Sequence, residues 1–153
     1  MSEKTAFKTW WNKLLSVAKK DPRYSLQAYH FVFEALDFAT YKLGKDPLSP
    51  REKERHVTGK QLLEGIREFA LQQFGYMARP VLETWGIKRC EDFGEIVFNL
   101  VESGLMGRTE SDTKEDFKGG YDFNTAFDDG FRFKGKFNIK TDWESIRTKS
   151  KKR

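Results

Sequence analysis

The chain has 153 residues, enough for one domain with a sizeable core, and its 14 Phe, 5 Tyr and 4 Trp predict that much of this core is aromatic. The net charge of +5 is unevenly distributed, because residues 1–20 carry +4 and residues 131–153 carry +7, whereas residues 21–108 carry −1 and residues 109–130 carry −5. A single cysteine excludes an intrachain disulfide, no apolar run is long enough to span a bilayer, and an N-terminus without a signal-like apolar region predicts a cytoplasmic protein.

The first twenty residues predict a basic amphipathic helix that precedes the globular domain. Its apolar stripe includes two adjacent tryptophans, Trp10 and Trp11, while most of its lysines lie off that stripe. Most amphipathic helices of globular proteins are half buried, so we expect the stripe to pack on the rest of the domain. A basic helix with tryptophans could also lie on an anionic membrane, and this is the weaker interpretation.

Two longer helices are predicted within the globular domain, which we place at residues 21–140. The stretch DPRYSLQAYHFVFEALDFATYKLG has Asp21 as a candidate N-cap and Pro22 at the first helical position. The stretch TGKQLLEGIREFALQQFG begins at another candidate N-cap, Thr58, and contains Gly65, which weakens a helix by about 1 kcal/mol relative to Ala. We therefore expect Gly65 to allow a close contact with another helix.

The next two helices have the order of a helix-turn-helix. The short segment ARPVLETWG is followed by the turn IKR and by a helix from about Glu91 to Ser103. In winged-helix domains, which continue into a hairpin, the second helix often enters the major groove of DNA. Here its outward polar positions are mostly acidic, so it should repel a duplex. We expect it to be structural or to dock a basic partner protein, with contacts from Glu91, Glu95, Asn99 and Glu102.

A β-hairpin is predicted at about residues 121–139. In YDFNTAFDDGFRFKGKFNI, apolar and polar residues alternate on either side of DDG, a three-residue loop with glycine at the position that needs positive φ. This register places Asp122 opposite Lys136, as a cross-strand pair of opposite charge. A short helix over Asp122–Phe127 is the competing interpretation.

Basic side chains are frequent in the predicted second strand and in residues 141–153, which we expect to form a disordered tail. They could bind nucleic acid or ribosomes without sequence preference and in a salt-sensitive way. Alternatively, the acidic residues 109–130 neutralise the strand within the molecule. The candidate nucleic-acid contacts are Arg132, Lys134, Lys136, Lys140, Lys149, Lys151, Lys152 and Arg153.

Residues that could carry catalysis or bind a metal are few. His30 and His56 are the two histidines, Cys90 is the single cysteine, and no spacing pairs them for nucleophilic catalysis. They also form no zinc motif, and the acidic stretch ESDTKED lacks the glycine and the terminal glutamate of a calcium loop. The stretch HVTGK lacks the upstream glycine of a phosphate-binding loop. We therefore expect no catalytic residue, no metal and no cofactor.

Four stretches resemble a bacterial protein family without an assigned activity. They are DPRYSLQAYHFVFEAL, HVTGKQLLEGIREFALQQFG, VLETWGIKRCEDFGEIVFNLVESGLM and SDTKEDFKGGYDF, and the similar region runs from about Asp21 to Phe127. The family that they resemble is restricted largely to planctomycete and verrucomicrobial bacteria. The resemblance implies a shared domain, but it assigns no catalytic or binding residue.

Together these expectations describe a mainly helical α+β domain, with a small helical bundle, a winged-helix-like second half and a C-terminal β-hairpin. The leading functional hypothesis is a non-catalytic cytoplasmic binding or adaptor module that has a protein partner. Association with nucleic acid or ribosomes through the basic C-terminus is the alternative. Attachment to a membrane surface is the least favoured hypothesis.

Overall fold

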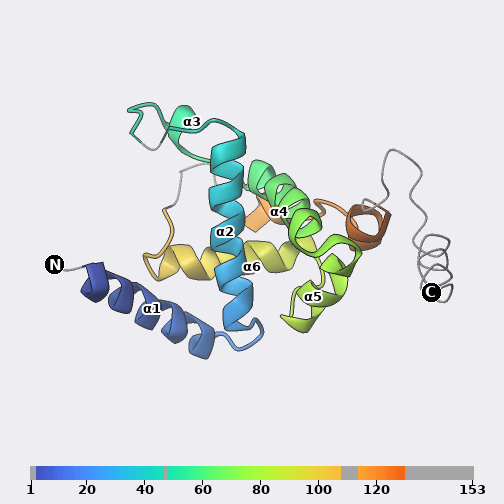
Figure 1. Cartoon of the computed structure of the whole chain (residues 1–153), viewed down its shortest axis with the longest axis horizontal. Coiled ribbons are helices and arrows are strands. Elements are labelled where there is room, and N and C mark those ends of the chain that lie inside the picture. The colour runs from blue at the N-terminus through green and yellow to red at the C-terminus, as the bar shows by residue number, and fades with distance from the viewer. Residues whose placement is uncertain (1–2, 47, 108–113, 130–153) are drawn as a thin grey trace, which may run out of the picture.

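All regular elements are helical in residues 3–46, 48–107 and 114–129, the part of the chain that the computed structural model describes (Figure 1). The α-helices of this part are α1 (Glu3–Lys20), α2 (Leu26–Lys42), α3 (Glu52–Arg55), α4 (Gly59–Phe74), α5 (Ala78–Thr84) and α6 (Cys90–Glu102). Its shorter elements are the 3₁₀ turns η1 (Gly75–Met77) and η2 (Lys114–Phe117) and the π-helical segment η3 (Asn124–Asp129). No helix among these residues is both long and apolar enough to span a bilayer.

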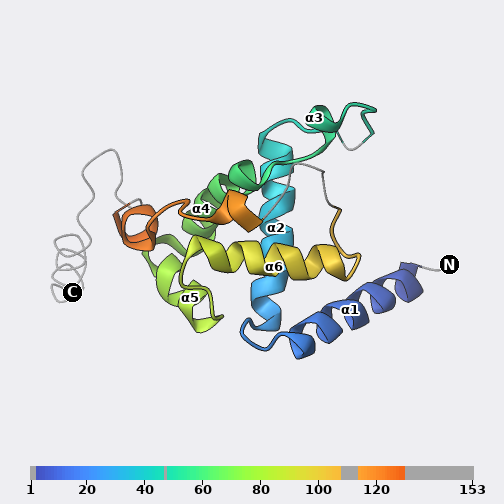
Figure 2. The same ribbon diagram turned by 180° about the vertical axis from the view of Figure 1, so that it is seen from behind.

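The central element is α2, and the other long helices pack around it (Figures 1 and 2). Both α4 and α6 contact α2, and α6 runs across it in the two opposite views. The short η2 packs on α4 and on α6, whereas α5 and η3 pack on each other and on α4. The N-terminal helix α1 contacts α2, and its first turns extend away from the other helices (Figure 2).

The contact between α2 and α4 depends on Gly65, as the sequence predicts. A Cβ atom built on Gly65 would lie 2.7 Å from the Cβ atom of Ala39 on α2, which is closer than real Cβ atoms approach. The two backbones are therefore separated by little more than one methyl group at this point. The missing side chain sets the distance between the central helices.

Helix starts are partly as predicted. Thr58 is the N-cap of α4, because its hydroxyl accepts a hydrogen bond from Gln61 N while the Gln61 side chain accepts one from Thr58 N, at 3.2 and 2.9 Å. The prediction for α2 is wrong, because this helix starts at Leu26 and Ser25 is its N-cap. Asp21 instead pairs with Arg23 in the turn between α1 and α2, at 2.7 Å.

The predicted β-hairpin at residues 121–139, and with it the α+β class, is wrong, because the described part of that stretch is helical. The Asp122 carboxylate accepts hydrogen bonds from Asn124 N and Thr125 N, so it caps a helix rather than facing a neighbouring strand. This helix buries Phe123, Ala126 and Phe127, whose spacing is helical. The competing interpretation of a short helix is confirmed. Residues 130–139 lie outside the described part of the chain.

The helix-turn-helix order of α5 and α6 is present, but it does not make a winged helix. The short α5 packs on α4 and η3, and α6 packs on α2 and η2. The hairpin that would form the wing is replaced by η3 in the described residues. The described residues after α6 thus contribute to the helical core, where Phe117, Phe123 and Phe127 are buried.

Candidate functional site

The helix α6 is fixed at both ends by its own sequence. At its start, Asp92 accepts hydrogen bonds from the backbone N–H groups of Lys88 and Arg89, at 2.9 and 3.2 Å. At its end, Gly104 has a φ of +78° and Leu105 N donates to Leu100 O, so the chain turns back on the last helical turn. Phe93, Ile96 and Leu100 are buried beneath it. One side of α6 therefore faces the core, and its polar residues lie on the other.

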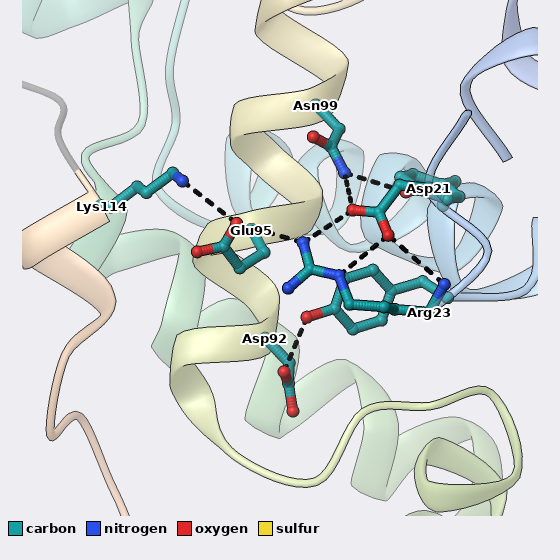
Figure 3. Close-up of polar contacts among 8 residues, drawn as sticks. Asp21, Arg23, Asp92, Glu95, Asn99 and Lys114 are labelled. Carbon is teal, nitrogen blue, oxygen red and sulfur yellow. Dashed lines mark hydrogen bonds and ion pairs between the residues drawn. The ribbon is translucent and has the colours of Figure 1, made fainter.

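The α6 polar face consists of Glu91, Asp92, Glu95, Asn99 and Glu102, and all of these residues except Glu102 contact other segments of the described chain. Figure 3 shows Asp92, Glu95 and Asn99 with their partners. The carboxylate of Glu95 accepts from Arg23 Nη2 at 3.4 Å and from Lys114 Nζ at 3.1 Å. These bonds connect α6 to the turn after α1 and to η2. The Glu91 carboxylate accepts a hydrogen bond from Gly119 N at 3.0 Å, which connects α6 to the chain beyond η2.

Asn99 and Asp92 form the remaining connections to the α1–α2 segment (Figure 3). The Asn99 amide Nδ2 donates to Asp21 Oδ2 at 2.8 Å and lies 3.1 Å from the hydroxyl oxygen of Tyr29. The Tyr24 hydroxyl donates to Asp92 Oδ1 at 2.7 Å. Both tyrosines are buried, so these bonds satisfy polar atoms that have little access to water.

The charges of this network shift the pKa values of its members. The hydrogen bond from Arg23 holds the pKa of Asp21 at about 2, and the bond from Asn99 acts in the same direction. Burial, reinforced by the bond to Asp92, raises the pKa of Tyr24 well above its ordinary value. Asp21 is thus a carboxylate and Tyr24 a neutral phenol throughout the physiological range.

The four residues predicted to contact a protein partner therefore differ in how accessible they are. Glu91, Glu95 and Asn99 bond to neighbouring segments of the same chain. Only Glu102 of the four is exposed without a hydrogen bond or ion pair to another of the described residues. The docking of a basic partner on this face stays a prediction, and such a partner would have to compete with Arg23 and Lys114.

The sequence-predicted nucleic-acid contacts all lie outside the described residues. They are Arg132, Lys134, Lys136, Lys140, Lys149, Lys151, Lys152 and Arg153. Lys136, the predicted cross-strand partner of Asp122, is one of these eight residues. Glu110 and Asp112 of the acidic stretch ESDTKED also lie outside the described residues. Nucleic-acid binding through these residues stays a prediction.

The candidate residues for chemistry lie apart. Cys90 is buried, its Sγ atom accepts a hydrogen bond from Tyr121 N at 3.3 Å, and burial raises the pKa of the thiol to about 11. His30 is on the surface of α2, 2.8 Å from Glu34, and His56 accepts a hydrogen bond from Arg55. Among the described residues, no three His, Cys, Asp or Glu side chains are grouped as a metal site. The Cys90 thiol is a poor nucleophile, because it is buried and its raised pKa keeps it protonated.

A cavity lies between α2, α4, α6 and η2 in the described part of the chain, and we call it the α2–α6 cavity. Its volume is about 610 Å³, which is the size of pockets that take small organic molecules. The walls are mostly apolar. The main apolar side chains are Leu36, Val57, Leu62, Val97, Val101 and Phe117.

Two glycines make room for the aromatic ring at one wall of this cavity. A Cβ atom on Gly94 of α6 would lie 3.0 Å from the Cβ atom of Phe117, and one on Gly59 of α4 would lie 3.2 Å from its ring. Phe117 is therefore held between the two helices, and it is buried. The cavity lies beside this contact, because Gly59, Gly94 and Phe117 all belong to its wall.

The polar part of the cavity wall is mainly cationic. Arg55 and Lys114 line it together with His56, and Asp37 is the one carboxylate among the described residues of the wall. Arg55 also donates to Ser49 O at 3.0 Å, and Lys114 lies 4.1 Å from the centre of the Phe98 ring. Thr58 and Gly59 at the N-terminus of α4 also line the cavity, and this end of a helix carries partial positive charge.

Sequence reasoning did not find this cavity. Its walls come from α2, the start of α4, the second half of α6 and η2, which are far apart in the sequence. The helical spacing of Val97 and Val101 predicts that both face inward, but spacing alone cannot distinguish a filled space from an open one. The one available signal was the pair of glycines, Gly59 and Gly94, because glycine within a helix often marks a close contact.

Comparisons with known proteins add no relative: no family model, no curated protein and no solved structure matches this chain.

Proposed function

We propose that this protein is a non-catalytic module that binds a small apolar molecule with an anionic group in the α2–α6 cavity. The observation that carries the proposal is the cavity itself, with a volume of about 610 Å³ and mostly apolar walls. Burying an apolar ligand there is favourable by about 25 cal/mol for each Å² removed from water. Membership of the bacterial family that the sequence resembles would be compatible with this role, and it remains part of the proposal.

The charge of the ligand follows from the polar wall. Lys114 and Arg55 are the two cations of the wall, and Asp37 is its one carboxylate among the described residues. Glu95, which does not line the cavity, forms an ion pair with Lys114 at 3.1 Å. Both cations already have partners within the protein, Glu95 and Ser49 O, so they are held in place before a ligand arrives. A carboxylate or sulfonate on the ligand would add a charge-assisted hydrogen bond to donors that are already oriented.

Fluorescence titration with two probes tests the proposal. The anionic probe is 1-anilinonaphthalene-8-sulfonate, and the uncharged probe of similar size is N-phenyl-1-naphthylamine. Val97→Phe places a larger side chain in the cavity, so we expect it to weaken binding of both probes at least tenfold without lowering stability. Val81→Phe, the same change on α5 away from the cavity, should leave both affinities unchanged.

A second variant separates the apolar part of the site from the charged part. Lys114→Met removes one cation of the wall, and we expect it to weaken the anionic probe several-fold while the uncharged probe keeps its affinity. Equal affinities of wild type and Val97→Phe for both probes would contradict a ligand site in the cavity. Equal effects of Lys114→Met on both probes would contradict only the proposal that the ligand carries an anionic group, and the apolar site would stand.

A further inference from the structure

The N-terminal helix α1 is anchored to the domain through its second half only. Leu14 and Val17 are buried, and the chain continues from Lys20 directly into the turn that leads to α2. Residues 3–9 are exposed without exception. In both views of the molecule this end of α1 extends beyond the other helices (Figures 1 and 2). The sequence expectation that the whole stripe packs on the domain therefore fits only the second half of the helix.

The exposed half bears an aromatic cluster that is continuous with the core. Trp10 packs edge-on against Phe33 of α2, with ring centres 5.4 Å apart. Phe7 stacks on Trp10 and Trp11 at 6.3 and 6.4 Å, yet 64% of its surface is exposed. The two tryptophans are half-buried and lie between Phe7 and the domain. The cluster thus starts at the core and ends in solvent at Phe7.

The lysines of α1 form no ion pairs within the described part of the chain. The helix carries five lysines and one glutamate, Glu3, and none of the five is ion-paired with a described carboxylate. Lysines of other elements differ, because Lys42 pairs with Glu68 and Lys114 with Glu95. At 100° per residue, the lysines flank the aromatic stripe on both sides. They are Lys4, Lys8, Lys13, Lys19 and Lys20.

We propose that the N-terminal half of α1 attaches the protein to an anionic lipid surface, with Phe7 in the interface and the flanking lysines at the head groups. Aromatic rings partition into the boundary between head groups and acyl chains, and lysines with long apolar stems reach from there to the phosphates. Each lysine near such a surface strengthens binding about fivefold. A second copy of the same helix is a poor partner, because it would bring two such clusters of positive charge together.

Co-sedimentation of the full chain with vesicles tests this inference. We expect binding to vesicles of phosphatidylcholine with one quarter phosphatidylglycerol, and at least tenfold weaker binding to phosphatidylcholine alone. Phe7→Ser should weaken binding about tenfold, and the double variant Lys4→Glu/Lys8→Glu should weaken it more than a hundredfold. Tyr41→Ser is the matched control, because Tyr41 is an aromatic residue of α2 that is 86% exposed and lies outside the cluster.

The same measurements identify the outcomes that would overturn the inference. Vesicle binding that survives both α1 variants would assign it to another basic segment of the full chain, and equal binding to both lipid compositions would exclude an electrostatic role. Light scattering without vesicles tests whether the aromatic cluster instead mediates self-association of the protein. A dimer of the wild type that Phe7→Ser converts to a monomer would make the aromatic cluster a protein interface, which contradicts the proposal. Circular dichroism of each variant verifies that the fold is retained.

Discussion

Asn99 connects three elements through one side chain amide. Its Nδ2 group lies 2.8 Å from Asp21 and 3.1 Å from the Tyr29 hydroxyl, so one residue of α6 contacts both the turn after α1 and the buried face of α2. The polar positions of an amphipathic helix are usually assigned to solvent, but most of those on α6 are half-buried and bond to other segments of the chain. Their hydrogen bonds connect α6, which forms one wall of the α2–α6 cavity, to the α1–α2 turn and to η2.

Truncation of Asn99 should therefore destabilise the protein more than truncation of its exposed neighbour. Asn99→Ala leaves Asp21 and Tyr29 without this donor, and the expected loss is about 1–3 kcal/mol in the free energy of unfolding. Glu102→Ala, on the same face of α6, should change it by less than about 0.5 kcal/mol. Urea unfolding of both variants gives the comparison. Equal losses would mean that the hydrogen bonds of Asn99 do not stabilise the fold.

The lowered pKa of Asp21 makes part of the free energy of unfolding depend on pH. In the folded state this pKa is about 2, mainly because Arg23 donates to the carboxylate, whereas an unfolded aspartate titrates near 3.9. The folded state therefore binds the proton less readily, so the contribution is complete above about pH 4 and is lost as the pH falls toward 2. Asp21→Asn should lower the free energy of unfolding at pH 6, and its difference from wild type should shrink between pH 4 and pH 2. A difference that stays constant from pH 6 to pH 2 would contradict this account.

At the scale of the element, local sequence signals predicted a helix boundary correctly when the capping side chain bonds to the backbone of its own helix. Thr58 and its partner Gln61 form the predicted start of α4. The prediction failed at Asp21, because a carboxylate that suits a helix cap bonds instead to Arg23 two residues later. It failed again at Asp122, where alternating aromatic residues suggested a strand and the carboxylate caps a helix. In both cases the choice depends on contacts that a local pattern does not contain.

The helix pair α2–α4 gives a sharp test of element packing. Gly65→Ala should improve the intrinsic helix propensity by about 1 kcal/mol, yet the new methyl group would lie 2.7 Å from Ala39 Cβ. Because the helices must move apart, we expect a net loss of about 1–3 kcal/mol. The compensating double variant Gly65→Ala/Ala39→Gly should recover part of it, which thermal unfolding of the three variants measures. A Gly65→Ala variant more stable than wild type would show that the contact is not tight.

At the scale of the whole molecule, the sequence predicted which apolar side chains of α6 face inward, but it did not predict where a cavity remains between the helices. Phe93, Ile96 and Leu100 are buried as their spacing indicates, whereas Val97 and Val101 of the same helix line the α2–α6 cavity. At Gly94, Phe117 of η2 packs closely on α6, whereas Val97 and Val101 in the next turns line open space between the described residues. The cavity lies between four separate elements, so the hydrophobic periodicity of any single element cannot predict it.

Three surfaces of the described residues enter the proposals in different ways. Most of the α6 polar face bonds to other segments of the chain, the α2–α6 cavity is the proposed ligand site, and the exposed half of α1 carries aromatic and basic side chains. The cavity is the feature on which the proposed function depends. The lipid surface and the ligand are proposed for different elements, so the failure of one proposal leaves the other intact.

Methyl NMR of the full chain during titration with 1-anilinonaphthalene-8-sulfonate tests the central claim most directly. We predict saturable shifts of the methyl signals of Leu62, Val97 and Val101, which line the cavity, while those of Leu14 and Leu82 in the core away from it stay unchanged. The same titration should produce no such shifts in Val97→Phe. Shifts that spare Val97 and Val101, or that spread evenly over methyl groups of the whole molecule, would contradict a binding site between α2 and α6.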